Sequence, residues 1–152
     1  MGKRKLVEGS KIKIMKFIIP GKPLGKQRIR VTKRGISYTP KQTVDYQNYI
    51  KEMYIYNGGK MLEGAIGLYI NAFLSIPKSI SKVKRVKMLA GEIKATKNPD
   101  VDNIAKIYGD ALNTIAFSDD RQIIRLIVNK YYSENPRVEI EIEELYKLEE
   151  EK

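Results

Sequence analysis

The chain has 152 residues, which suits one domain, since chains of this size bury about 70% of their surface on folding. It contains no cysteine and no histidine, which excludes disulfides, Cys/His zinc sites, thiol nucleophiles and every catalytic group based on imidazole. The net charge of +11 lies unevenly: residues 1–40 hold twelve Lys/Arg against one acidic residue, and residues 133–152 hold three against eight. This distribution is typical of proteins that bind a polyanion, although an ordinary lysine-rich surface explains the total equally well.

No apolar run approaches the roughly 20 residues that a membrane span needs, and the N-terminus lacks the apolar stretch of a signal peptide. We therefore expect a cytoplasmic protein with no membrane partner. Residues 1–14 are expected to be a flexible basic tail, residues 15–146 the domain, and residues 147–152 an acidic C-terminal tail.

The first part of the domain predicts a strand at 16–19 and then a cationic loop. The loop, residues 20–40, is punctuated by glycine and proline and ends in a short strand at 36–38. Cations in a stiffened loop occupy fixed positions, so we expect four of them to hold nucleic-acid phosphates. These are Lys22, Lys26, Arg28 and Arg30.

A helix is predicted to follow this loop. Thr39 serves as its cap, Pro40 takes the first helical position, and Gln42 completes a capping box. Apolar and tyrosine side chains recur at helical spacing over residues 46–54, and glycines at 58–59 end the helix. Such a stripe usually faces the core, so we expect its tyrosines there rather than stacked on bases.

The middle of the chain predicts a strand and a short helix. Residues 66–76 alternate apolar and polar side chains, the period-two pattern of a strand. Ser81 is placed to cap a helix over residues 82–90, whose charged face is expected to be solvated rather than in contact with a DNA flank. Its inward-facing residues are predicted to be Val83, Val86 and Leu89 or Ala90.

The strongest helical pattern covers residues 103–115, with an apolar stripe from Ile104 to Ile115. Residues 123–132 then predict a largely buried strand, and residues 138–142 a last strand with alternating side chains. The order of elements predicts an α+β fold, with a mixed β-sheet covered by helices in a single domain.

Two acidic pairs flank this helix. Asp100 and Asp102 precede it in a stretch that is expected to be extended, where side chains two apart share a face. An N-cap role explains Asp102 but leaves Asp100 without a role. Asp119 and Asp120 lie in the turn after the helix, where aspartates commonly bond to the backbone. Neither pair alone is specific, but capping does not predict both pairs around one amphipathic helix.

The chemistry of these residues points to a hard metal ion. Clustered carboxylates repel one another unless a cation lies between them. Oxygen ligands alone favour Mg²⁺ or Mn²⁺, which can activate water for phosphodiester hydrolysis. Lys106, one turn into the helix, is placed to meet a phosphate or the attacking water. Its structural alternative, an i,i+4 pair with Asp110, is worth only about 0.2–0.5 kcal/mol.

At these residues the sequence resembles the RusA family of Holliday-junction resolvases, over about residues 16–145. The signature is carried by Asn98-Pro99-Asp100-Val101-Asp102-Asn103-Ile104-Ala105-Lys106, Asp110-Ala111-Leu112, Phe117-Ser118-Asp119-Asp120-Arg121-Gln122-Ile123 and Lys130. Residues 20–23, 26–30 and 38–40 are similar to the family's opening. Ile29 departs from it, because many relatives have proline between the two arginines.

The resemblance implies a homodimeric nuclease that uses Mg²⁺ to make paired nicks across four-way junction DNA in recombination and repair. A two-fold pair of chains also matches the approximate two-fold symmetry of such a junction. The resemblance assigns metal binding and catalysis to Asp100, Asp102 and Asp120, and an essential catalytic role to Lys106. Second-tier acidic positions fall on Asp110 and Asp119. Lys130 joins the expected DNA-binding residues.

Two other classes of protein remain open at this point. A non-catalytic protein that binds branched nucleic acid explains the cationic loop but not the aspartates. A sugar-nucleotide transferase is suggested by the Asp-x-Asp at 100–102, but it explains neither the second acidic pair nor the loop.

Overall fold

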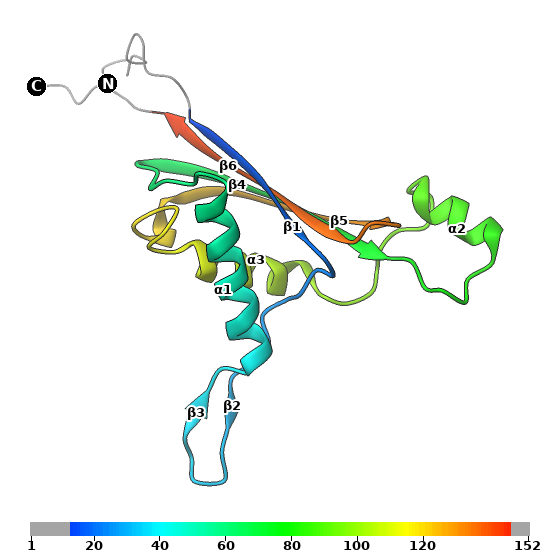
Figure 1. Ribbon diagram of the computed structural model, residues 1–152, viewed down its shortest axis with the longest axis horizontal. Helices are drawn as coiled ribbons and strands as arrows, with labels where there is room; N and C mark the ends of the chain where they lie inside the picture. Colours follow the sequence, from blue (N-terminus) through cyan, green and yellow to red (C-terminus); the bar gives the residue numbers. More distant parts are fainter. Residues whose placement is uncertain (1–12, 147–152) are drawn as a thin grey trace, which may run out of the picture.

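The computed structural model describes residues 13–146 and contains one four-stranded sheet, three α-helices and a separate two-stranded hairpin (Figure 1). The elements in chain order are β1 (Ile14–Pro20), β2 (Arg30–Val31), β3 (Ser37–Tyr38), α1 (Lys41–Tyr56), β4 (Ala65–Ser75), α2 (Lys82–Leu89), α3 (Val101–Leu112), the 3-10 helix η1 (Asp120–Gln122), β5 (Ile123–Ser133) and β6 (Arg137–Tyr146). The predicted α+β fold with a mixed sheet is confirmed. The tails expected at 1–14 and 147–152 lie outside the described residues, except for Lys13 and Ile14, and Ile14 already belongs to β1.

The sheet has the strand order β1-β6-β4-β5. β6 pairs antiparallel with β1 and β4, whereas β5 runs parallel to β4. The connection from β4 to β5 contains α2 and α3, as a parallel pair requires a long crossover. β5 and β1 are therefore the two edges of this sheet.

The core lies between the sheet and the pair α1 and α3, which cover the same face (Figure 1). Tyr46 and Tyr54 of α1 are buried, which confirms that the tyrosine stripe belongs to the core. The hydroxyls of Tyr46 and Tyr108 lie 2.7 Å apart where the two helices cross. Burial raises the pKa of both hydroxyls, and that of Tyr108 strongly.

The start of α1 differs from the prediction. Pro40 itself is the N-cap residue, with no side-chain capping bond, and the helix begins at Lys41. Gln42 does not close a capping box, because its Oε1 accepts a bond of 3.1 Å from Gln27 of the preceding loop. A contact between two segments has replaced the expected local one.

The prediction for α2 is correct in its cap and wrong in its inward face. The Ser81 hydroxyl accepts a bond of 3.3 Å from the backbone N–H of Lys84. The buried residue of α2 is Met88, whereas the four predicted inward residues, Val83, Val86, Leu89 and Ala90, are exposed. The reason is that α2 lies beyond one end of the sheet, where little of its surface meets the body (Figure 1).

The prediction of a largely buried β5 is wrong as well. β5 pairs with β4 alone among the described strands, and most of its residues are exposed or half-buried. Its exposed apolar residues are Ile124, Leu126, Ile127 and Tyr131. An apolar run is typical of a strand covered on both faces, and the sequence contains no signal that this one lies at an edge.

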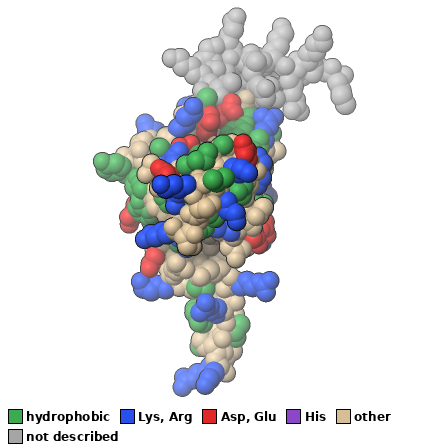
Figure 2. Space-filling view, turned by 90° about the vertical axis from the view of Figure 1, so that its right-hand side faces the viewer, with side chains coloured by type: hydrophobic (Ala, Val, Ile, Leu, Met, Phe, Trp, Pro, Cys, Tyr) green, Lys and Arg blue, Asp and Glu red, His purple; other side chains and the backbone are tan. Residues whose placement is uncertain are grey.

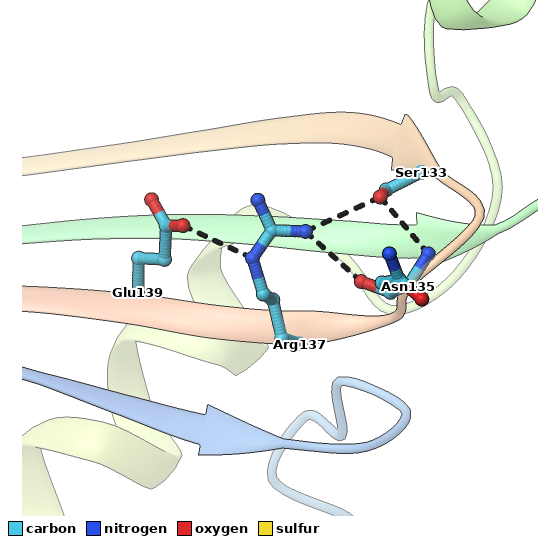
Figure 3. A network of polar contacts seen from close by, with 4 residues as sticks. All are labelled: Ser133, Asn135, Arg137 and Glu139. Carbon is cyan, nitrogen blue, oxygen red and sulfur yellow. Dashed lines mark hydrogen bonds and ion pairs between the residues drawn. The ribbon is translucent and has the colours of Figure 1, made fainter.

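The turn from β5 to β6 is held by a polar network around Arg137 (Figure 3). Its guanidinium donates to the Ser133 hydroxyl at 3.2 Å and to the Asn135 carbonyl at 3.0 Å, while its Nε donates to Glu139 at 3.0 Å. The same guanidinium lies 4.0 Å above the ring of Phe73 on β4. These contacts fix the end of β5 as the chain crosses over β4.

No helix within residues 13–146 is long and apolar enough to span a membrane.

Candidate active site

The acidic site is organised by the N-terminus of α3. The helix begins at Val101, so Asp100 is the N-cap residue and Asp102 lies in the first turn. The expectation that Asp100 and Asp102 share an extended stretch is therefore wrong, and so is the alternative that Asp102 is the N-cap. Within the described structure Asp100 makes no side-chain capping bond, which leaves its role unexplained by helix capping. Carboxylates at this end are favoured by the partial positive charge of the helix N-terminus.

The outer face of α3 carries a row of charged residues one turn apart. The inner face is buried: Ile104, Ile107, Tyr108, Ala111 and Leu112. This burial turns Asp102, Lys106 and Asp110 towards solvent, because residues four apart share a helix face. Lys106 Nζ lies 3.8 Å from Asp102 Oδ2, so its ion pair is with Asp102 and not with Asp110, the structural alternative that the sequence offered.

The cationic loop packs against the start of α3. The Lys26 backbone N–H donates to the Asn103 carbonyl at 2.9 Å, and the Lys26 ammonium forms an ion pair with Asp110. Gly25 permits this close approach, because a Cβ there would lie 2.9 Å from the Cβ atoms of both Asn103 and Pro99. The loop and the helix enclose a cleft of about 400 Å³ whose lining includes Lys22, Lys26, Asn98, Asp100 and Asn103. Cations and a carboxylate thus share one cleft.

The segment before Asp100 is fixed by Lys130 of β5. Its ammonium donates to the carbonyls of Lys97 at 2.6 Å and Pro99 at 3.1 Å. Lys97 in turn donates to the Ser75 carbonyl at 2.5 Å, at the end of β4. The sequence predicted a DNA-binding role for Lys130 and none for Lys97. No local signal indicates these bonds, because the partners of Lys130 are 31 and 33 residues away.

The second acidic pair lies at the other end of α3. Asp119 caps η1: its carboxylate accepts from the Arg121 backbone N–H at 2.9 Å and lies 3.1 Å from Arg121 Nε. The bond from the Arg121 backbone lowers the pKa of Asp119 most, and the bond from the Arg121 side chain lowers it further. Local structure therefore accounts for Asp119. The neighbouring Asp120 is exposed and begins η1, which directly precedes β5.

One chain does not bring the two acidic pairs together. Asp100 precedes α3 and Asp120 follows it, and a helix of 12 residues is about 18 Å long. Accordingly, among residues 13–146 no three acidic side chains are grouped closely enough to hold a metal ion. The structure unites Asp100 with Lys22 and Lys26 in a cleft, and Asp102 with Lys106 on the adjoining helix face. Arg28 and Arg30 lie farther along the loop, towards and within β2.

The fold and the cleft define a small basic α+β protein in which a carboxylate and cations share a site, an arrangement typical of nucleases. Comparison with known proteins makes the class specific. A family model described as Endodeoxyribonuclease RusA matches residues 20–143. The Uncharacterized protein YqaN of Bacillus subtilis (strain 168) is 32% identical over 137 residues, which cover 86% of this chain and 96% of that protein. The chain belongs to the RusA family of Holliday-junction-resolving endodeoxyribonucleases, as its signature residues predicted.

Proposed function

We propose that the protein resolves four-way DNA junctions by Mg²⁺-dependent paired nicks, as a homodimer whose two active sites each combine residues of both copies. Family membership supports the endonuclease activity and the junction substrate. The observation that carries the composite site is the position of Asp120, at the far end of α3 from Asp100.

The two ends of β5 explain how a second copy would complete the site. Asp120 lies in η1, just before the beginning of β5, whereas Lys130, near the end of the strand, holds the segment before Asp100. From Ile123 to Lys130 the strand spans about 23 Å. Two β5 strands that run antiparallel about a two-fold axis would bring the beginning of each beside the end of the other. The partner subunit's Asp120 would then lie near Asp100 and Asp102.

Exposed apolar side chains support pairing along β5. An unpaired edge strand is a ready site for a second strand, and contiguous apolar surface on such an edge is typical of an interface. α2 packs against β5 and adds further apolar surface beside it. The residues concerned are Ile124, Leu126, Ile127, Val83, Val86 and Leu89.

The donor set of such a composite site fits Mg²⁺ or Mn²⁺. Asp100, Asp102 and the partner subunit's Asp120 supply only oxygen ligands, and a partly hydrated Mg²⁺ needs no more than a few of these. The bound ion would supply a water of lowered pKa and stabilise charge on the phosphate. Lys106, on the exposed row beside Asp102, would bind the scissile phosphate. Lys22 and Lys26 would hold the neighbouring phosphates in the cleft.

Subunit mixing tests the composite site. Asp100→Asn and Asp120→Asn homodimers are each expected to lose nicking while they retain junction binding. In a mixed dimer of these two variants, one site has lost both carboxylates and the other is intact. We therefore expect mixed dimers to make one Mg²⁺-dependent nick per junction without resolving it.

The matched control mixes Asp100→Asn with Asp102→Asn. Both changes affect the same cluster, so each of the two sites carries one lesion and the mixed dimer stays inactive. Inactive Asp100→Asn/Asp120→Asn dimers, with subunit exchange verified by differently tagged copies, would show that the site is not shared between subunits. Normal nicking by the Asp100→Asn homodimer would refute the active site itself.

A further inference from the structure

The β2–β3 hairpin projects away from the sheet and from both core helices (Figure 1). Arg30 pairs with Tyr38, and Val31 with Ser37. The turn is closed around Thr32: its N–H donates to the Ile36 carbonyl at 2.9 Å, its carbonyl accepts from the Gly35 N–H at 2.9 Å, and its hydroxyl accepts from the Ile36 N–H at 3.1 Å. The hairpin is thus a defined ribbon, yet every residue from 28 to 38 is exposed.

Its composition indicates what it contacts. Exposed apolar side chains alternate with cations, and the segment 28–38 contains no acidic residue. The apolar residues are Ile29, Val31, Ile36 and Tyr38, and the cations are Arg28, Arg30, Lys33 and Arg34. Figure 2 shows the hairpin below the body, with Lys/Arg side chains at its tip. A surface of this kind is complementary to a polyanion with apolar faces, such as DNA, and not to a second copy of itself.

The base of the hairpin is tied to the cleft. The Gln27 backbone N–H donates to the hydroxyl of Thr43, a buried residue of α1, at 3.3 Å. One residue earlier, Lys26 is bonded to Asn103 of α3. The direction of the ribbon is therefore set relative to Asp100, and DNA held in the cleft would meet it.

We propose that the β2–β3 hairpin inserts into the centre of branched DNA, with Val31 and Ile36 against bases exposed at the branch point and with Lys33 and Arg34 on phosphates. This inference rests on the proposed function. A two-stranded ribbon is narrow enough to enter a DNA groove, and apolar side chains can wedge between base steps and unstack them. Unstacking costs least where the base stack is already interrupted, as it is at the branch point of an open junction, so the apolar residues would favour a junction over a linear duplex. Lys33 and Arg34 would strengthen binding to the junction and to the duplex alike.

The test uses the Asp100→Asn protein, which is expected to bind without cutting, and two double variants in that background. Val31→Ser/Ile36→Ser is expected to weaken four-way junction binding by about tenfold, the loss typical of one stacking contact, and to leave duplex binding nearly unchanged. It is also expected to reduce the fluorescence rise of 2-aminopurine placed at the branch point. Lys33→Ala/Arg34→Ala is expected to weaken both complexes and to lower the slope of log affinity against log salt by roughly two.

The matched control is Ile55→Ser/Tyr56→Ser, which removes two apolar side chains at least about as exposed, at the other end of α1, and is expected to change neither affinity. Val31→Ile/Ile36→Val is expected to retain junction preference, and unchanged melting temperatures would show that the variants are folded.

Equal affinity losses for junction and duplex, or none, would overturn the proposal. So would a loss of dimer by sedimentation with junction preference intact, which would make the hairpin a subunit contact. Failure of the parent protein to bind junctions would overturn the proposed function as well, whereas unchanged junction binding by the hairpin variants would overturn this inference alone.

Discussion

At the scale of single residues, the charged side chains on the outer face of α3 take no part in core packing. Lys106 and Asp102 have side chains that are 62% and 66% exposed, and their N···O distance is 3.8 Å. An exposed pair of this kind contributes at most about 1 kcal/mol to stability. The pair with Asp102 therefore stabilises the helix little, which leaves Lys106 available for the phosphate contact that we propose.

Replacement of Lys106 by alanine is expected to lower the single-turnover nicking rate by about 10²-fold or more, because the lost cation acts on charge that develops at the phosphate. Junction affinity and melting temperature are expected to change little. Lys41→Ala is the matched control, since it removes another exposed i,i+4 pair, with Asp45. A nicking rate in Lys106→Ala equal to that of the parent would contradict the catalytic role.

Lys130 gives the second prediction at this scale, because its ammonium is bonded to the two carbonyls before Asp100. Lys130→Met keeps the length of the side chain but leaves both carbonyls without this donor, which we expect to cost about 1–3 kcal/mol in unfolding free energy. Nicking is expected to fall with it. A lysine bound to a phosphate would instead lower the salt slope of junction binding by about 0.9 with no loss of stability, so denaturation and salt titration together distinguish the two roles.

At the scale of elements, the packing of the cationic loop against the start of α3 makes the cleft. Two independent segments meet there: the loop through Lys26, and the segment before α3 through Lys130. Each segment is irregular, so its position depends on contacts with regular elements rather than on its own hydrogen bonds.

Gly25→Ala tests this packing. The added Cβ would lie 2.9 Å from two other Cβ atoms, neither of which is the end of a flexible side chain, so the loop is expected to move away from α3. We expect a lower melting temperature and a lower nicking rate. In Gly109→Ala, a change within α3 with open space around the new Cβ, we expect the protein to gain up to about 1 kcal/mol. A Gly25→Ala protein that keeps its melting temperature and nicking rate would show that the close approach is not required.

At the scale of the whole molecule, β5 is an edge strand with exposed apolar side chains. A single chain leaves this edge with several exposed isoleucine and leucine side chains. The other edge strand, β1, also exposes isoleucines, at positions 14 and 18. The two edges therefore offer a matched comparison.

Ile124→Lys/Ile127→Lys is expected to convert the proposed dimer to a folded monomer and to abolish nicking, because charges along the paired edges would repel and the composite site would be lost. Sedimentation and circular dichroism measure the two properties. Ile14→Lys/Ile18→Lys on β1 is expected to leave dimer and nicking intact. Dimers that survive the β5 change, or dissociate with the β1 change, would place the interface elsewhere.

Much of the fold and part of the site are determined by local signals in the sequence. Periodicity predicted all four strands of the main sheet and the three helices, and the spacing of aspartates and Lys106 identified the family. Charge located the cationic loop. These properties depend on residues that are near one another in the chain, so they can be predicted from the sequence without the structure.

The tertiary structure decided the properties that depend on distant partners. Gln42 bonds to Gln27 instead of closing a local capping box, and Lys130 donates to a carbonyl in the segment before α3. β5 lies at an edge of the sheet despite its apolar sequence. The same holds for the separation of Asp100 from Asp120, since the length and direction of α3 set it. The reason is physical: hydrogen bonding and burial are satisfied by whichever group the whole fold brings near, and one strand or loop does not encode its neighbour.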